Sequence, residues 1–178
     1  MYFKFVKRML DVILSLVLIV LLLPVIILTF LLTLIHLGIP VFDIRFPREG
    51  KNKKEFYMLK FRTRVYDTNT LWGRKTKLSY WIDKLKLNEL PQLFNILKGD
   101  MSFVGPRAFI CGENLPKGKI SPKRYYVRPG VTGLFQVTGK GTHSDKLKCD
   151  IEYYDNLSFM LDLKILLKTP FSILKDLK

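Results

Sequence analysis

The sequence predicts a mixed α/β fold that is mainly helical, with a membrane-embedded helix at the N-terminus followed by a small cytosolic domain. Three observations support this prediction. Residues 12–35 are almost wholly apolar, the segments beyond residue 80 repeat apolar side chains at helical spacing, and only short stretches alternate as strands do. We therefore expect a membrane-embedded part at 1–38 and one small domain at 39–178.

The composition is typical of a protein that works at a membrane surface. Apolar residues make up 48% of the 178 residues, yet the formal net charge is +15. A basic domain joined to an apolar segment indicates anionic partners such as lipid head groups and nucleotides. Nucleic acid is not expected, because the basic residues are spread along the chain and no DNA- or RNA-binding motif occurs.

The apolar run is long enough to cross a bilayer as one helix. Positive residues flank it on both sides, with Lys7 and Arg8 before it and a group from Arg45 to Lys54 after it. Because positive charge marks the cytoplasmic side, this symmetry favours a re-entrant helix that enters and leaves by the same face. Pro24, near the middle of the run, removes a backbone hydrogen bond and can supply the break. A spanning helix is the alternative that these residues leave open.

In the polar domain the pattern predicts short strands at 56–63 and 134–137, and a strand followed by a turn at 102–108. Residues 81–98 have helical spacing. Pro91 lies inside that pattern, so we expect a break or a second helix there.

The segment that follows Pro91 has a good helix end in Gly99. The tail from residue 151 to 178 predicts one or two helices, with too many apolar residues for a single core-facing stripe. Lysines are mixed among them, so such a helix can lie in the bilayer interface as an amphipathic anchor. A core helix with a solvated face is the alternative.

Three arginines stand beside proline, in the motifs PREG, GPRA and VRPG, and a fourth lies in KFRT. The guanidinium group offers a planar fork that matches phosphate oxygens, and rigid surroundings hold that fork in place. This pattern indicates an anion site. Acidic residues, among them Glu89, are available to hold a divalent cation together with substrate oxygens.

The motif NELPQLFNILKGDMSFVGPR at 88–107, with REG at 48–50, KFRT at 60–63 and RPGVTG at 128–133, resembles one family. The chain is similar to the small monotopic phosphoglycosyl transferases, the bacterial sugar transferase family. The resemblance implies transfer of a sugar phosphate from a UDP-sugar to polyprenyl phosphate with release of UMP, in glycoconjugate and exopolysaccharide biosynthesis. It implies a re-entrant membrane helix and a domain on the cytoplasmic face of the bacterial inner membrane.

The resemblance also implies roles for individual residues. The family nucleophile is the aspartate of an Asp-Glu dyad, which forms a covalent phosphosugar intermediate, and Mg²⁺ sits near the glutamate. On the matched positions, Asn88 replaces the aspartate and Glu89 is the expected Mg²⁺ ligand. Arg62, Arg107 and Arg128 are the expected contacts to substrate phosphates or the nucleotide. Pro24 is expected to set the membrane break.

Asn88 is the departure with the largest chemical consequence, because a carboxamide is a very poor nucleophile towards phosphorus. Four further positions depart from the family pattern: Asp83 for a frequent arginine, Ala108 for a second proline after GPR, Leu23 for the serine before the membrane proline, and Leu134-Phe135 for a tryptophan.

Scattered changes of this kind favour loss of catalysis over a single engineered substitution. Three hypotheses follow from them. The chain is a catalytically impaired member, a pseudoenzyme that binds the membrane and pairs with other glycan-pathway proteins. Alternatively, it is an active transferase that uses Glu89 or another acid, or whose native aspartate was replaced to trap a complex. The third hypothesis is a non-catalytic membrane scaffold.

Overall fold

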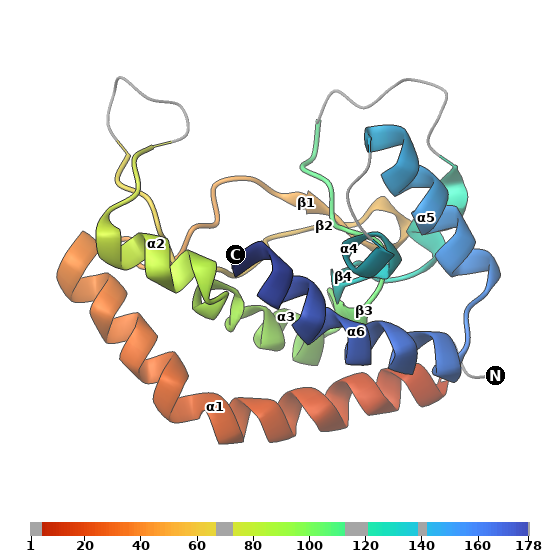
Figure 1. Ribbon diagram of the computed structural model, residues 1–178, viewed down its shortest axis with the longest axis horizontal. Helices are drawn as coiled ribbons and strands as arrows, with labels where there is room; N and C mark the ends of the chain where they lie inside the picture. The colour runs from red at the N-terminus through yellow and green to blue at the C-terminus, as the bar shows by residue number, and fades with distance from the viewer. Residues whose placement is uncertain (1–4, 67–72, 113–120, 139–141, 178) are drawn as a thin grey trace.

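The computed structural model describes residues 5–66, 73–112, 121–138 and 142–177 (Figure 1). The fold is mainly helical with small two-stranded sheets, as the sequence predicts. In chain order the elements are α1 (Lys7–Leu37), β1 (Arg48–Glu49), η2 (Lys51–Lys53), β2 (Glu55–Phe56), α2 (Lys77–Lys84), η3 (Leu87–Glu89), α3 (Gln92–Lys98), β3 (Ser102–Val104), η4 (Pro122–Tyr126), β4 (Gly130–Thr132), α4 (Leu134–Thr138), α5 (His143–Asp155) and α6 (Phe159–Leu177).

The apolar run forms one long helix, α1, of 31 residues with Pro24 inside it. In the part of the chain that the structure describes, it is the only helix long and apolar enough to cross a membrane by length and composition. Figure 1 shows α1 running along one side of the molecule and bending near its middle.

The buried face of α1 is largely polar. Its buried residues are Lys7, Asp11, Ser15, Ile26, Thr29 and Thr33, which recur at helical spacing on one side of the helix. Many large apolar side chains of α1 are exposed instead. A helix packed on a protein in water would bury its apolar side chains and expose its polar ones. The outer face of α1 is therefore suited to lipid.

Polar contacts fix the N-terminal half of α1 to the rest of the fold. Arg8 donates to the carbonyl oxygens of Ile96 (2.6 Å) and Leu97 (2.8 Å), at the C-terminal end of α3. The carboxylate of Asp11 accepts from the hydroxyl of Ser102 (3.0 Å) and from the backbone N–H of Phe103 (3.1 Å). These polar contacts add to the apolar packing of Leu18, Ile19 and Leu22 of α1 against the core.

The strand predicted at 56–63 is wrong beyond Phe56, where β2 ends. The side chain of Asn95 supplies the physical reason. Its carbonyl oxygen accepts from the N–H of Leu59 (2.8 Å), and its amide donates to the carbonyl of Tyr57 (2.9 Å). Asn95 thus takes the place of a partner strand at Tyr57 and Leu59. Beyond them, Phe61 forms an isolated antiparallel bridge with Phe42.

The helical pattern at 81–98 divides into α2, η3 and α3. Pro91 is the residue before α3, so the predicted break is confirmed. Gly99 ends α3 with φ 98°, a left-handed conformation that glycine adopts without strain, as expected. The helix begins earlier than predicted, at Lys77, where the side chain of Thr76 accepts from the N–H of Ser79 in a capping box.

The strand predicted at 102–108 is confirmed as β3, which pairs in parallel with β4. The two backbones come very close to each other at Gly105, which follows β3, and at Gly130, the first residue of β4. A Cβ on Gly130 would lie 2.1 Å from the backbone nitrogen of Gly105, so neither position has room for a side chain. The loop that carries Arg107 follows directly from this contact.

The strand predicted at 134–137 is wrong, because these residues form α4. Leu134 and Val137 are three residues apart, and both pack against a cluster that contains Tyr153 and Ile165. Tertiary packing thus outweighs the β propensity of this short stretch. The tail forms two helices, α5 and α6, in line with the second of the predicted arrangements.

Candidate active site

A sharp turn between α2 and α3 brings the side chains of Asp83 and Asn88 together. Lys86 takes a left-handed conformation (φ 60°), which interrupts the helical path between α2 and η3. The amide nitrogen of Asn88 then donates to Oδ1 of Asp83 at 3.0 Å. Asn88 is only 5% exposed, and its Oδ1 has no hydrogen-bond partner within the described part of the chain.

Glu89 is held by two donors. Nζ of Lys60 lies 2.9 Å from Oε1, and Nε2 of Gln92 donates to Oε2 at 3.1 Å. Burial raises the pKa of Glu89, but the charge and hydrogen bond of Lys60, the nearby charge of Lys86 and the Gln92 bond outweigh it, so the pKa lies below its usual value. Glu89 is therefore ionised at neutral pH.

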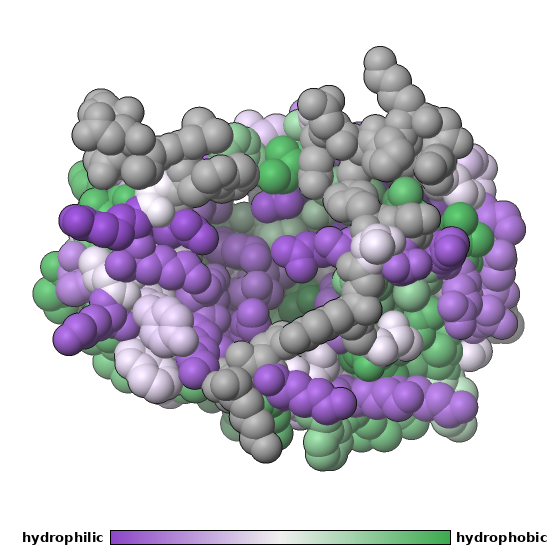
Figure 2. All heavy atoms as spheres, turned by 45° about the horizontal axis from the view of Figure 1, so that its top comes forward, coloured by the Kyte–Doolittle hydropathy of each residue, from purple (hydrophilic) through white to green (hydrophobic). Residues whose placement is uncertain are grey.

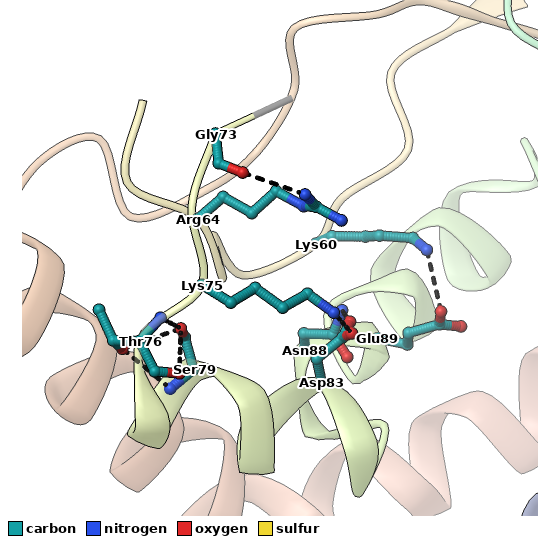
Figure 3. A network of polar contacts seen from close by, with 9 residues as sticks. All are labelled: Lys60, Arg64, Gly73, Lys75, Thr76, Ser79, Asp83, Asn88 and Glu89. Carbon is teal, nitrogen blue, oxygen red and sulfur yellow. Dashed lines mark hydrogen bonds and ion pairs between the residues drawn. The ribbon is translucent and has the colours of Figure 1, made fainter. Parts of the chain in front are cut away.

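Asp83 carries a second ion pair at the same site. Its Oδ2 contacts Nζ of Lys75, and its side chain is 33% exposed. Figure 3 shows the side chains of Lys60, Arg64 and Lys75 extending side by side towards the group formed by Asp83, Asn88 and Glu89. A surface with cations beside carboxylates can bind a diphosphate together with a metal ion.

Arg107, whose side chain is exposed, is positioned through a hydrogen bond to its backbone. The guanidinium of Arg124 donates to the carbonyl of Arg107 at 2.7 Å. Arg124 is itself fixed by Asp150 (3.1 Å) and stacks 3.6 Å from the ring centre of Phe109. Burial raises the pKa of Asp150 to about 6, although the charge of Arg124 opposes this. The side chain of Arg107 is thus presented by a rigid backbone.

The two other predicted arginines contact helix ends in this structure. Arg62, 8% exposed, donates to the carbonyls of Leu37 and Gly38 at the C-terminal end of α1. Arg128 donates to the carbonyl of Gly99 (2.7 Å) at the end of α3. These bonds satisfy carbonyls that a helix leaves unpaired, so both arginines have a structural role. Their contact with substrate stays a prediction.

A cavity of about 700 Å³ opens next to Glu89. Leu18 and Leu22 of α1 and Phe103 form part of its apolar wall, and Arg107 and Lys146 are among its polar lining. Asn88 and Asp83 do not line it. Figure 2 shows hydrophilic side chains gathered around a hollow in the face of the molecule that it presents. The cavity joins the membrane helix to the charged groups of the site.

Within the described ranges, no group of three or more His, Cys, Asp or Glu side chains is placed to hold a metal ion. Mg²⁺ is often bound by one or two carboxylates, with water and substrate phosphate as the remaining ligands. Each oxygen of Glu89 accepts one hydrogen bond and keeps a lone pair, so this donor set fits a Mg²⁺ that arrives with a diphosphate.

The sequence identified Glu89 and Arg107, which the cavity brings together. It did not identify Lys60, Lys75 and Gln92 as site residues, and it treated Asp83 only as a departure from a family pattern. The sequence signal for Asp83 was that it lies five residues before Asn88. That spacing indicates a contact between the two side chains only when the helix is interrupted between them.

Comparison with known proteins gives a consistent result. Residues 2–176 match the family model described as bacterial sugar transferase. An uncharacterized sugar transferase, EpsL, of Bacillus subtilis is 36% identical over 176 residues, covering 94% of this chain and 87% of that protein.

Two further relatives are longer than this chain. The UDP-galactose-lipid carrier transferase of Erwinia amylovora is 30% identical over 97% of this chain. The UDP-glucose:undecaprenyl-phosphate glucose-1-phosphate transferase of Xanthomonas campestris is 36% identical over 76% of it. The aligned part makes up 41% and 32% of these two proteins, respectively.

Proposed function

Because the chain belongs to the bacterial sugar transferase family, we propose that it binds a UDP-sugar and a polyprenyl phosphate at a membrane surface and serves the family reaction. In that reaction the sugar phosphate passes to the polyprenyl phosphate and UMP leaves. Relatives named as transferases acting on UDP-glucose or undecaprenyl phosphate support this assignment.

The cavity is the observation that carries the proposal. Its apolar wall includes Leu18 and Leu22 of the membrane helix, and its polar lining includes Arg107 and Lys146. A polyprenyl phosphate has the same division into a long apolar tail and a charged head. We place the tail along α1 and the phosphate at Arg107, whose fork matches phosphate oxygens.

The geometry of α1 supports a re-entrant helix at the cytoplasmic face of the bacterial inner membrane. At 1.5 Å per residue the helix is about 46 Å long, more than a bilayer core requires. Both of its ends nevertheless contact the same domain. Lys7 pairs with Asp162 near the start, and His36 contacts Thr76 (2.7 Å) near the end. We propose that Pro24 causes the bend of α1 and that the membrane-embedded part ends at residue 38. We further propose that α6 lies in the bilayer interface.

The exposed face of α6 supports its interfacial placement. Met160, Leu163, Leu167, Phe171 and Leu174 are exposed and recur every three or four residues, which places them on one side of the helix. Lysines such as Lys164 and Lys168 lie beside this stripe and can reach lipid phosphates.

Labelling of single cysteines tests the topology. Cys111 and Cys149 are replaced by serine, and Phe5→Cys and Ile39→Cys are made separately, since these positions are 75% and 83% exposed. A membrane-impermeant maleimide should label both variants in inverted membrane vesicles and neither in intact spheroplasts. Labelling of the two variants from opposite sides would refute the re-entrant helix.

Glu89 is the residue proposed to hold Mg²⁺. When bound, the cation would neutralise charge on the diphosphate and on the leaving UMP. Lys60 and Gln92 keep the carboxylate ionised and fixed, and Lys60 and Lys75 add positive charge beside the phosphates. These residues act on binding and orientation.

Asn88 limits what this site can do by the family route. An amide has no charged oxygen to attack phosphorus, and Asn88 is also buried. If no other carboxylate attacks, the chain binds both substrates without turnover and acts through other proteins of the glycan pathway. Catalysis therefore depends on whether a second acid takes the place of the missing aspartate.

Release of UMP tests the proposed function. The protein in nanodiscs with undecaprenyl phosphate and Mg²⁺ is incubated with UDP-glucose, UDP-galactose and UDP-N-acetylgalactosamine, and calorimetry measures binding in parallel. At least one UDP-sugar should bind, more weakly to Glu89→Ala. Absence of binding to every UDP-sugar tried would leave the scaffold hypothesis in place of ours.

A further inference from the structure

We propose that Asp83 is the attacking carboxylate of this site, in place of the side chain at position 88; this inference rests on the proposed function. The hydrogen bond between Asp83 and Asn88 motivates it. Oδ1 of Asp83 lies 3.0 Å from Nδ2 of Asn88, the group that stands where the family aspartate would have an oxygen. The carboxylate of Asp83 thus places a negative charge within hydrogen-bond distance of the position where the family aspartate would have one.

Exposure favours Asp83 over Asn88 as the group that meets a substrate. The side chain of Asp83 is 33% exposed, while Asn88 is 5% exposed. Attack on phosphorus requires the two reacting atoms to approach to about 3–3.5 Å with correct alignment, and the more exposed carboxylate of Asp83 makes that approach more readily than the side chain at position 88. Asn88 instead orients the carboxylate by donating to it.

The charges around Asp83 suit attack on a diphosphate. Lys75 contacts Oδ2 of Asp83, while Oδ1 accepts a hydrogen bond from Asn88. Oδ1 keeps a second lone pair that can attack phosphorus. Lys75 precedes Thr76, whose capping contacts with Ser79 fix the backbone at the start of α2. In Figure 3, Lys60 ends at Glu89 and Arg64 runs in the same direction above it, and both add positive charge near the phosphates.

The site also keeps the number of carboxylates that the reaction needs. Asp83, Asn88 and Glu89 lie close together in Figure 3, and each of the two acids has a lysine partner. Glu89 borders the cavity that we assign to the lipid, and it is the residue proposed to hold the metal. Asp83 is then the acid left for attack from the nucleotide side.

The proposed step balances in atoms and electrons. An oxygen of Asp83 attacks the β-phosphorus of the UDP-sugar and forms an O–P bond, while the bond from that phosphorus to the bridging oxygen breaks. UMP leaves with the electron pair. The phosphate oxygen of the polyprenyl phosphate then attacks the same phosphorus, breaks the bond to Asp83 and restores the carboxylate.

The exchange variant Asp83→Asn/Asn88→Asp is the decisive reagent. It contains the same atoms at the two positions and can keep the same hydrogen bond, so it controls for folding. We expect Asp83→Asn alone to lose UMP release by ~100-fold or more, as removal of a nucleophile does in other enzymes. The exchange variant should recover to within ~10-fold of the native chain. Asp155→Asn, which removes a surface carboxylate paired with Lys123, should have no effect.

Trapping identifies the attacking residue directly. Hydroxylamine converts an acyl phosphate to a stable hydroxamate, and trypsin then separates the candidates. Residues 78–84 form one peptide whose sole acid is Asp83, and residues 87–98 form another whose sole acid is Glu89. Mass spectrometry should find the hydroxamate on the first peptide, in the presence of UDP-sugar only.

The outcomes separate the two proposals. A hydroxamate on residues 87–98, or unchanged UMP release by Asp83→Asn, would overturn the role of Asp83 while leaving the family reaction intact. The role of Asp83 is likewise overturned if the native chain binds a UDP-sugar without releasing UMP and Asn88→Asp alone is active. Failure of every variant to bind any of the three UDP-sugars would instead reject the proposed function itself.

Discussion

The buried ion pair between Lys7 and Asp162 should be a main attachment of the membrane helix to the domain. Nζ of Lys7 lies 2.6 Å from Oδ2 of Asp162, and the two side chains are only 9% and 6% exposed. The hydroxyl of Tyr153 donates to the other carboxylate oxygen at 2.7 Å. The pair therefore links the first turn of α1 to α5 and α6.

Replacing one partner should destabilise the protein more than replacing both. Lys7→Met leaves the carboxylate buried without its cation, which costs about 3–5 kcal/mol in comparable cases. We expect about 3 kcal/mol, the lower end, because Tyr153 still donates to Asp162. Lys7→Met/Asp162→Asn removes both charges and keeps that hydrogen bond, so it should cost only about 1 kcal/mol.

Denaturant unfolding in detergent micelles, followed by tryptophan fluorescence, measures the free energy of unfolding of the native chain, both single variants and the double variant. Asp162→Asn leaves the ammonium of Lys7 buried and should also cost about 3 kcal/mol, so the double-mutant cycle should give a coupling of about 5 kcal/mol between Lys7 and Asp162. Strictly additive effects of the two substitutions would refute the reasoning, since they would mean that the pair contributes no energy of its own.

Three shorter predictions concern other parts of the fold. Because the pKa of Asp150 is raised to about 6, the folded state binds the extra proton; the native chain should therefore lose about 2–3 kcal/mol relative to Asp150→Asn as pH rises from 4 to 7, measured by unfolding at each pH. Gly130→Ala should prevent stable folding because its Cβ would meet Gly105, whereas Gly112→Ala, with no atom within 4 Å but φ +75°, should cost only about 1–2 kcal/mol in thermal melts. Arg107→Ala should raise the KM for undecaprenyl phosphate by roughly 10–100-fold with little change in the KM for UDP-sugar, as loss of a charge-assisted hydrogen bond predicts.

Local signals were sufficient for parts of the fold. Pro91 marks the start of α3 and Gly99 its end, because a proline fits before the first turn and a left-handed glycine ends the last one. These preferences depend on the residue itself. The strand expected at 56–63 failed for the opposite reason, because Asn95, distant in the chain, bonds the backbone of Tyr57 and Leu59 where a partner strand would be. A pattern confined to one segment contains no information about such a partner.

The arginines show why residue type alone does not separate structure from function. Phosphate oxygens and the free carbonyls at a helix end are both hydrogen-bond acceptors that arginine recognises through the same N–H groups. Arg62 and Arg128 lie at helix ends, while Arg107 lines the cavity beside Glu89. Arg107 and Arg128 both stand next to proline in the sequence, so their position in space, and not their sequence neighbours, distinguishes them.

The same limit applies to Asp83 and Asn88, and it changes how their substitutions are understood. On a continuous helix, residues five apart do not face each other, so the sequence presents two separate losses: an arginine replaced by an acid, and a nucleophile replaced by an amide. The left-handed Lys86 interrupts the helix, and Nδ2 of Asn88 then lies 3.0 Å from Oδ1 of Asp83. In space, the two changes leave the site with one carboxylate beside Glu89, moved by a hydrogen-bond length and paired with Lys75. If Asp83 attacks as we propose, retention of the reaction accounts for a carboxylate at this point, whereas drift after loss of catalysis gives no reason for one there.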